Sequence, residues 1–198
     1  MNQDLQVYRN LAKDILDTNI YYHSLALEAC LGAIYDYLLN SKQLDKDEPT
    51  RSDWLLAGIV HDIDYFGQYK ADHLKKTTEV LKLHHLDISD TVLNIVKAHG
   101  PHITGRQPQN KAEWAIFCAD SLTGLIVAVA LVYPTKKLAD VKLSSVLKRF
   151  HKEPRFAAGT RRQEVSMCQD KQGLNIPVDK FIEICLNAIQ SIAPNIGL

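Results

Sequence analysis

The most apolar stretch of the chain is Trp114–Tyr133, and it constrains the fold more than any other segment. Its length resembles that of a membrane span, but Asp120 lies inside it beside Ser121, Thr123 and Gly124. The uninterrupted apolar part is too short to cross a bilayer comfortably. We therefore expect this stretch to form the central buried helix of a soluble bundle.

A helical period of apolar residues dominates the remaining chain, and no convincing run of alternating strand residues appears. A chain of 198 residues with 46% hydrophobic content suits one domain with a substantial core. We predict an all-α, compact single-domain helical bundle over residues 1–198, with a core motif region at 20–135 and C-terminal helices within 138–193 packed on it. The expected helices are Asp4–Leu16, Tyr22–Leu39, one ending at His61-Asp62, Ala71–His84, Asp90–His99, Trp114–Tyr133, Leu138–Phe150, Phe156–Gln172 (capped by Thr160 with Gln163) and one starting at Pro177.

Charge and cysteine content limit the classes of partner and compartment. The 23 basic and 23 acidic residues give zero net charge, which argues against a general binder of nucleic acid or membrane surfaces. Cys30, Cys118 and Cys185 lie in apolar helical patterns, and Cys168 forms no CxxC motif with them. Buried free thiols suit a reducing cytosol. Met1–Asp17 is polar and carries no secretory pattern, so we expect a cytoplasmic protein.

The segment Leu55–Gly67, which reads LLAGIVHDIDYFG, begins as an apolar helix and ends in His61-Asp62, with Asp64 following. An imidazole and a carboxylate at the end of a buried helix are costly unless something compensates them. A divalent metal is one compensator, since both groups are natural ligands of zinc, iron or manganese. A capped helix end is the alternative, and a lone His-Asp dipeptide favours it. Further ligands must therefore come from elsewhere in the chain.

Four more polar residues lie on or near apolar helical faces: His23, His73, His99 and Asp120. A single histidine in such a place is more often a hydrogen-bonded core residue than a ligand. Asp120 differs, because an unpaired carboxylate in a buried helix is rarely tolerated. Pairing with Arg or Lys and ligation of a metal both remain open for it.

Taken together, the order His23, His61-Asp62, His73, His99, Asp120 resembles the HD-domain superfamily of metal-dependent phosphohydrolases, whose motif is H…HD…D with optional histidines before the last element. The small bacterial members are the most similar. The resemblance runs through YYHSLALEA, AGIVHDIDYFG, NIVKAHG and FCADSLTGLIVA, and continues in PTKKLADV and RFAAGTRR.

The resemblance implies a helical bundle with a central metal site. His23, His61, Asp62 and Asp120 match the primary ligands. His73 and His99 match the two histidines that binuclear members add, with Asp62 as the bridge. Imidazole-rich ligation favours iron, manganese, zinc, cobalt or nickel over magnesium alone. We expect one or two such ions.

A divalent ion lowers the pKa of its bound water toward ~7, which supplies a hydroxide for attack on phosphorus. Asp62 and Asp64 are the candidate catalytic carboxylates. Asp64 would orient water or hold a ligand histidine, and an ordinary turn residue is the alternative. Candidate substrate-binding residues are Arg106, Lys137 (beside Lys136) and Arg162 (beside Arg161), against the alternative of solvated surface charges. His102, in the loop after His99, is expected on the surface.

These expectations favour a metal-dependent phosphohydrolase that acts on a nucleotide or another small phosphate ester, with no nucleic-acid or membrane partner. Two alternatives stay open. One is a di-iron oxygenase of the same fold, and the other is a non-catalytic binding module stabilised by its metal.

Overall fold

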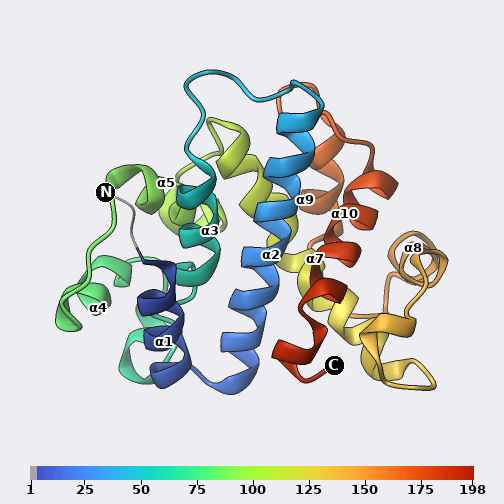
Figure 1. The fold of residues 1–198 in the computed structure, drawn as a ribbon, viewed down its shortest axis with the longest axis horizontal. Helices are drawn as coiled ribbons and strands as arrows, with labels where there is room; N and C mark the ends of the chain where they lie inside the picture. Colours follow the sequence, from blue (N-terminus) through green and yellow to red (C-terminus); the bar gives the residue numbers. More distant parts are fainter. Residues whose placement is uncertain (1–3) are drawn as a thin grey trace.

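The computed structural model describes residues 4–198, and every regular element in that range is helical (Figure 1). The predicted all-α bundle is therefore confirmed, while Met1–Gln3 of the polar N-terminal stretch lie outside the described residues. The α-helices are α1 (Leu5–Ile15), α2 (Thr18–Asn40), α3 (Arg51–Val60), α4 (Thr77–Leu83), α5 (Asp90–Ala98), α6 (Pro101–Thr104), α7 (Lys111–Val132), α8 (Leu143–Lys152), α9 (Arg162–Ser166) and α10 (Val178–Ser191). Short 3-10 turns are η1 (Gly67–Asp72), η2 (Leu138–Asp140), η3 (Met167–Gln169) and η4 (Ala193–Ile196).

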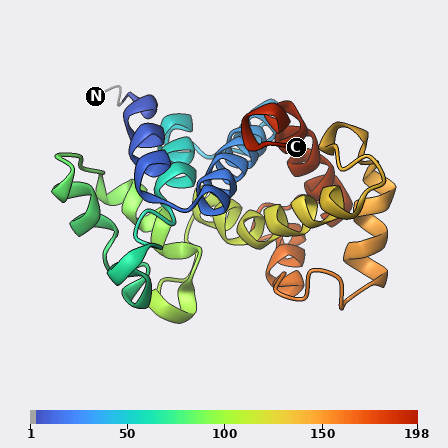
Figure 2. The same cartoon turned by 90° about the horizontal axis from the view of Figure 1, so that it is seen from below.

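The core lies between α2, α3, α5, α7 and α10, which contact one another in the centre of the bundle (Figures 1 and 2). α2 and α3 approach closely at Gly58. A Cβ added there would lie 2.7 Å from the Cα of Glu28, closer than real Cβ contacts allow. Glycine at this position therefore lets the two helices that carry His23 and His61 meet backbone to backbone.

α7 begins at Asn110, whose side chain accepts a hydrogen bond from the Glu113 amide. It is long and apolar enough to cross a membrane by length and composition, but 67% of its most apolar window is buried inside the protein. Within the described residues it packs against α2, α5, α8, α9 and α10. The central buried helix expected from its sequence is thus what the structure contains.

The predicted helix Ala71–His84 is wrong in its first half. Leu74 has a φ of 69°, which an α-helix does not accommodate. The buried Asp64 carboxylate accepts hydrogen bonds from the Lys76 amide and the Thr77 hydroxyl, so it satisfies the first donors of α4 from outside the helix. Helix α4 therefore starts only at Thr77, and His73 lies in the preceding turn.

The segment after Pro134 also differs from expectation. α8 starts at Leu143, later than predicted, and the predicted helix Phe156–Gln172 shrinks to α9 and η3. Ala157 has a φ of 45°, and the Thr160 side chain makes no cap, so the expected Thr160–Gln163 capping box is absent. α8 and α10 nevertheless pack on α7, as expected of the C-terminal helices.

The four cysteines are buried and free, as the apolar patterns around three of them predicted. Burial raises the pKa of the Cys168 thiol to about 12.

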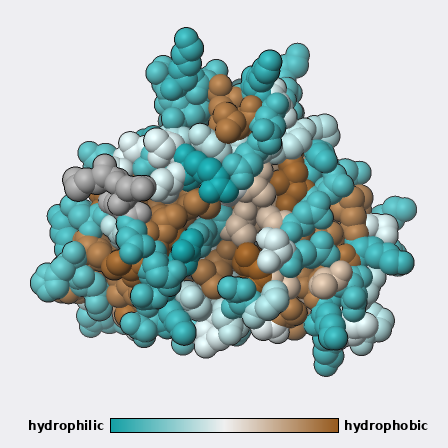
Figure 3. Space-filling view, viewed as in Figure 1, coloured by the Kyte–Doolittle hydropathy of each residue, from teal (hydrophilic) through white to brown (hydrophobic). Residues whose placement is uncertain are grey.

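The outer surface mixes polar and apolar groups, and on the face shown in Figure 3 hydrophobic groups lie near the middle with hydrophilic ones around them.

Candidate metal centre

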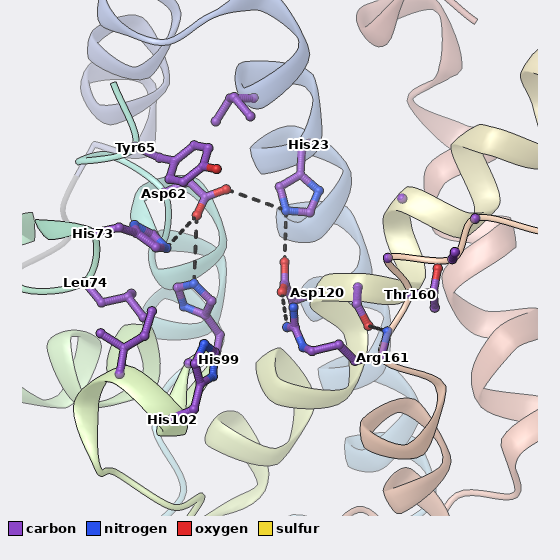
Figure 4. Close-up of a pocket in the computed structure, with 18 residues that line it drawn as sticks. His23, Asp62, Tyr65, His73, Leu74, His99, His102, Asp120, Thr160 and Arg161 are labelled. Atoms are coloured by element: carbon purple, nitrogen blue, oxygen red, sulfur yellow. Dashed lines mark hydrogen bonds and ion pairs between the residues drawn. The ribbon is translucent and has the colours of Figure 1, made fainter. Parts of the chain in front are cut away.

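A cavity of ≈ 520 Å³ opens where α2, α5, α7 and the turns after α3 and before α9 meet. His23, Asp62, His73, His99 and Asp120 line it and point toward one another (Figure 4). His61 lies behind them with 1% of its side chain exposed. The six predicted ligands therefore converge, although they come from separate parts of the chain.

His61 and His99 occupy equivalent places at the C-terminal ends of α3 and α5. The last carbonyl groups of a helix lack partners inside the helix. His61 Nδ1–H donates to the Gly58 carbonyl at 2.9 Å, and His99 Nδ1–H donates to the Val96 carbonyl at 2.6 Å. Each ring is thereby oriented with its Nε2 toward the cavity, which is how ligand histidines are held.

His23 and His73 are oriented by side chains. The Thr123 hydroxyl donates its proton to the Asp120 carbonyl at 2.7 Å, so it accepts from His23 Nδ1–H at 2.8 Å. His73 Nδ1–H donates to the Asp64 carboxylate at 2.7 Å. All four imidazoles thus present Nε2 to the same space.

Asp62 lies between two pairs of these histidines. Its Oδ2 is 3.2 Å from His61 Nε2 and 3.8 Å from His23 Nε2. Its Oδ1 is 3.3 Å from His73 Nε2 and 3.8 Å from His99 Nε2. Two three-residue groups that share Asp62 could each hold a metal ion, since in each group the ligand atoms lie within 4.8 Å of one another.

Asp120 contacts both a basic side chain and the other candidate metal ligands, so both possibilities considered from its sequence are compatible with its position. Its Oδ1 lies 2.9 Å from His23 Nε2 and 3.8 Å from His61 Nε2, while its Oδ2 accepts from Arg161 Nη2 at 2.6 Å. One oxygen therefore faces the histidine cluster and the other faces a cation at the cavity wall.

The carboxylates of the site favour positive charge within it. Burial alone would lower the pKa of His61, but the carboxylates of Asp62 and Asp120 outweigh it and raise the pKa to about 9. Burial, together with the charge on His61, lowers the pKa of His99 to about 4. The pKa values of Asp62 and Asp120 stay well below their usual range, because the histidines outweigh the opposing effect of burial.

The donor set fits a divalent transition metal, being composed of imidazole nitrogens and carboxylate oxygens. His61 Nε2 is buried, and because its 3.2 Å contact with Asp62 Oδ2 lacks hydrogen-bond geometry, it has no hydrogen-bond partner among residues 4–198. Buried polar atoms in native proteins are nearly always satisfied. A cation at this atom would satisfy it and would offset the two carboxylates.

Asp64 does not line the cavity, so the structure does not support its prediction as a catalytic group. Its fully buried carboxylate accepts hydrogen bonds from His73, from the Lys76 amide and from the Thr77 hydroxyl. It holds His73 and the turn that carries it, which matches the expected role of holding a ligand histidine.

None of the three predicted substrate-binding residues lines the cavity. Arg106 pairs with the buried Glu113 at 2.6 Å, and Lys137 is exposed beyond the end of α7. Arg162 is satisfied by backbone carbonyls of the segment before α9, which makes it a structural residue. Those carbonyls belong to Arg149, Phe150, Glu153, Phe156 and Ala157.

Arg161 lines the cavity, whereas the predicted substrate-binding residue was its neighbour Arg162. Its amide donates to the Ser121 hydroxyl, and its guanidinium pairs with Asp120 (Figure 4). The guanidinium also pairs with Glu164. The RFAAGTRR segment was the available signal, but it did not reveal which arginine points inward. His102 also lines the cavity while remaining exposed, so its predicted surface position holds only in part.

Comparison of the chain with family models, curated proteins and solved structures finds no match. The site is therefore interpreted from its own geometry.

Proposed function

We propose that the protein is a metal-dependent phosphohydrolase of the HD-domain type, acting on a nucleotide or another small phosphate ester. The observation that carries the proposal is the position of Asp62 between two histidine pairs, each of which completes a group able to hold a metal ion. Such paired sites suit phosphoester hydrolysis, because two adjacent cations hold both the attacking and the leaving oxygen.

His23, His61 and Asp120 would hold one ion, His73 and His99 the other, and Asp62 would bridge them. Iron, manganese, zinc, cobalt and nickel all suit these ligands. Bound there, divalent cations supply a water of lowered pKa and positive charge opposite the phosphate oxygens. The chain itself contributes the orientation of its imidazoles through their Nδ1–H bonds. Arg161, at the cavity wall, would donate to a phosphate oxygen.

The test is metal analysis of protein purified without added metal, followed by a screen of nucleotides and sugar phosphates with and without EDTA. We expect a transition metal in the purified protein and phosphate release that EDTA abolishes. Metal-dependent oxygen consumption without phosphate release would instead identify a di-iron oxygenase. A metal whose removal lowers the melting temperature, with no turnover of any substrate, would identify a binding module.

A reducing compartment suits the four buried thiols, so we further propose a cytosolic setting. Fractionation of the native cell, with detection of the protein in the soluble cytosolic fraction, tests this part separately.

A further inference from the structure

A second cavity of ≈ 420 Å³ lies on the other side of His23 from the metal centre. α2 and α7 form its walls, and η4 with the residues after it closes one end. Among the described residues, His23 and Gly124 are the two that line both cavities, so the cavities adjoin at these residues. We call this second cavity the apolar annex.

Gly124 is an exposed residue of α7 that lines both cavities. It lies in the middle of α7, where glycine is unfavourable. A Cβ added at this position would meet no atom within 4 Å. Close packing therefore does not require a glycine here. What its missing side chain provides is open space beside Asp120 and His23.

The annex differs from the metal centre in chemistry. Its lining includes the aliphatic and aromatic side chains of Tyr22, Ala26, Val127, Leu131 and Ile196, and also the polar side chains of Asn19 and Thr123. No carboxylate, lysine or arginine side chain is among the described residues that line it. Leu131 is 53% exposed and forms part of this lining, although large apolar side chains are usually buried.

We propose that the apolar annex holds the organic group of the substrate, and that the substrates are phosphate esters of apolar alcohols. The inference rests on the proposed function, because the phosphate would lie at Asp62 and Asp120 while the alcohol passes over Gly124. A sugar would find few polar side chains there, such as Asn19 and Thr123, to bond its hydroxyl groups, and leaving the other hydroxyls without partners is costly. An alkyl or aryl group has no such cost.

In the reaction, the oxygen of water bonds to phosphorus and the P–O bond to the alcohol breaks. One proton of the water ends on the alcohol oxygen, and inorganic phosphate is the other product. From Gly124 to Leu131 the helix rises about 10 Å, at 1.5 Å per residue. The annex thus accepts a chain of several carbons in extended form.

The first experiment measures binding alone. Alkylphosphonates from methyl to octyl, which lack the P–O–C bond, are titrated calorimetrically into metal-loaded protein. We expect affinity to rise about three- to fourfold per methylene until the annex is full. In the Val127→Phe variant, which fills the annex, we expect the octyl-to-methyl affinity ratio to fall at least tenfold. Val132→Phe is the matched control, since Val132 lies on the same helix, is 55% exposed and does not line the annex.

Leu131→Gln provides a second variant at an exposed position, in case Val127→Phe does not fold. This variant should reduce the increase in affinity from methylphosphonate to octylphosphonate. It should leave the increase from methylphosphonate to propylphosphonate as in wild type. Affinity that does not depend on chain length, or that changes equally in Val127→Phe and Val132→Phe, would refute the proposal that the annex binds the organic group.

The second experiment compares hydrolysis of octyl phosphate, glucose 6-phosphate and a nucleoside monophosphate. Faster turnover of octyl phosphate supports the annex, and faster turnover of either polar ester overturns it. Binding that depends on chain length, without hydrolysis of any ester, would support the proposal that the annex binds the organic group and would refute the phosphohydrolase. Hydrolysis of all three esters with equal efficiency would support the phosphohydrolase and refute the proposed role of the annex.

Discussion

His23 Nε2 lies 2.9 Å from Asp120 Oδ1, although 97 positions separate these two residues in the chain. The Thr123 hydroxyl already accepts the Nδ1 proton of His23. A neutral His23 would therefore turn a lone pair toward a carboxylate. A proton or a metal ion between the two atoms removes that repulsion, which is why the contact is central to the proposed site.

Replacement of Asp120 by Asn tests this contact. Asn keeps the volume and one acceptor oxygen but loses the charge that attracts a cation. We expect metal affinity to fall about 10–100-fold, with a corresponding loss of phosphoester hydrolysis. The fold should persist, because Arg161 is 37% exposed and keeps Glu164 as a partner. Metal content, melting temperature and turnover are measured with and without EDTA.

Asp179→Asn is the control for that variant, since Asp179 forms an exposed pair with His151. It should match wild type in all three measurements. An Asp120→Asn protein that binds metal and turns over substrate like wild type would refute the ligand assignment. One that melts much earlier than metal-free wild type would show that the Arg161 pair is mainly structural.

The shared carboxylate predicts a particular metal stoichiometry. His99→Ala removes a ligand from one group and His61→Ala removes one from the other. We expect wild type to hold two ions per chain, each of these variants to hold one, and Asp62→Asn to hold none. Elemental analysis after dialysis measures the ratio, with His151→Ala as the control. A wild-type protein with a single ion, unaffected by His99→Ala, would contradict the binuclear arrangement.

The pKa of His61 predicts how metal binding depends on pH. In the metal-free protein this pKa is raised to about 9, so the imidazole carries a proton at pH 7 that a metal must displace. His99, with its pKa lowered to about 4, is already neutral there. Metal affinity should therefore increase from pH 6 to 8, by up to about tenfold per unit from His61. Competition with a chelator of known pH dependence measures it, and an affinity that stays constant would exclude a protonated His61.

The same shift predicts the stability of the metal-free protein. A raised pKa means that the folded state binds the His61 proton more tightly than the unfolded state does, where the ordinary value is 6.5. This contribution is fully present below pH 6.5 and is lost as the pH rises through about 9. Urea unfolding of EDTA-treated protein at pH 6.5 and 9 should show lower stability at pH 9. His61→Gln should lose most of that difference, and retention of the full difference would assign it to another group.

Arg161 and Arg162 should behave differently despite being adjacent. Arg161→Ala should weaken the binding of inorganic phosphate to metal-loaded protein about tenfold or more, by removing a charged hydrogen-bond donor. Its melting temperature should change little. Arg162→Ala should cost about 1–3 kcal/mol of stability, because partly buried carbonyl groups lose their donor. Calorimetric titration with phosphate and thermal unfolding separate the two, and equal effects on both measurements would contradict the assignment.

The sequence by itself determined the all-α class, the buried position of α7 and the residue types of the metal centre. These follow from local properties: a helical apolar period and the cost of a carboxylate in an apolar helix. The order of His23, His61-Asp62 and Asp120 was recognised through its resemblance to the HD-domain motif.

Only the tertiary structure decided how these residues are used. Asp62 separates two histidine pairs because α2, α3 and α5 pack around one point, and no local pattern specifies that distance. Leu74 and Ala157 have positive φ values that sequence patterns do not predict for non-glycine residues. Those two turns redirect the chain. As a result, His73 donates a hydrogen bond to Asp64, and the arginine that faces the cavity is Arg161 instead of Arg162. The direction of a side chain at a turn depends on the backbone that tertiary packing imposes, and this is why the substrate-binding residues could not be predicted from the chain alone.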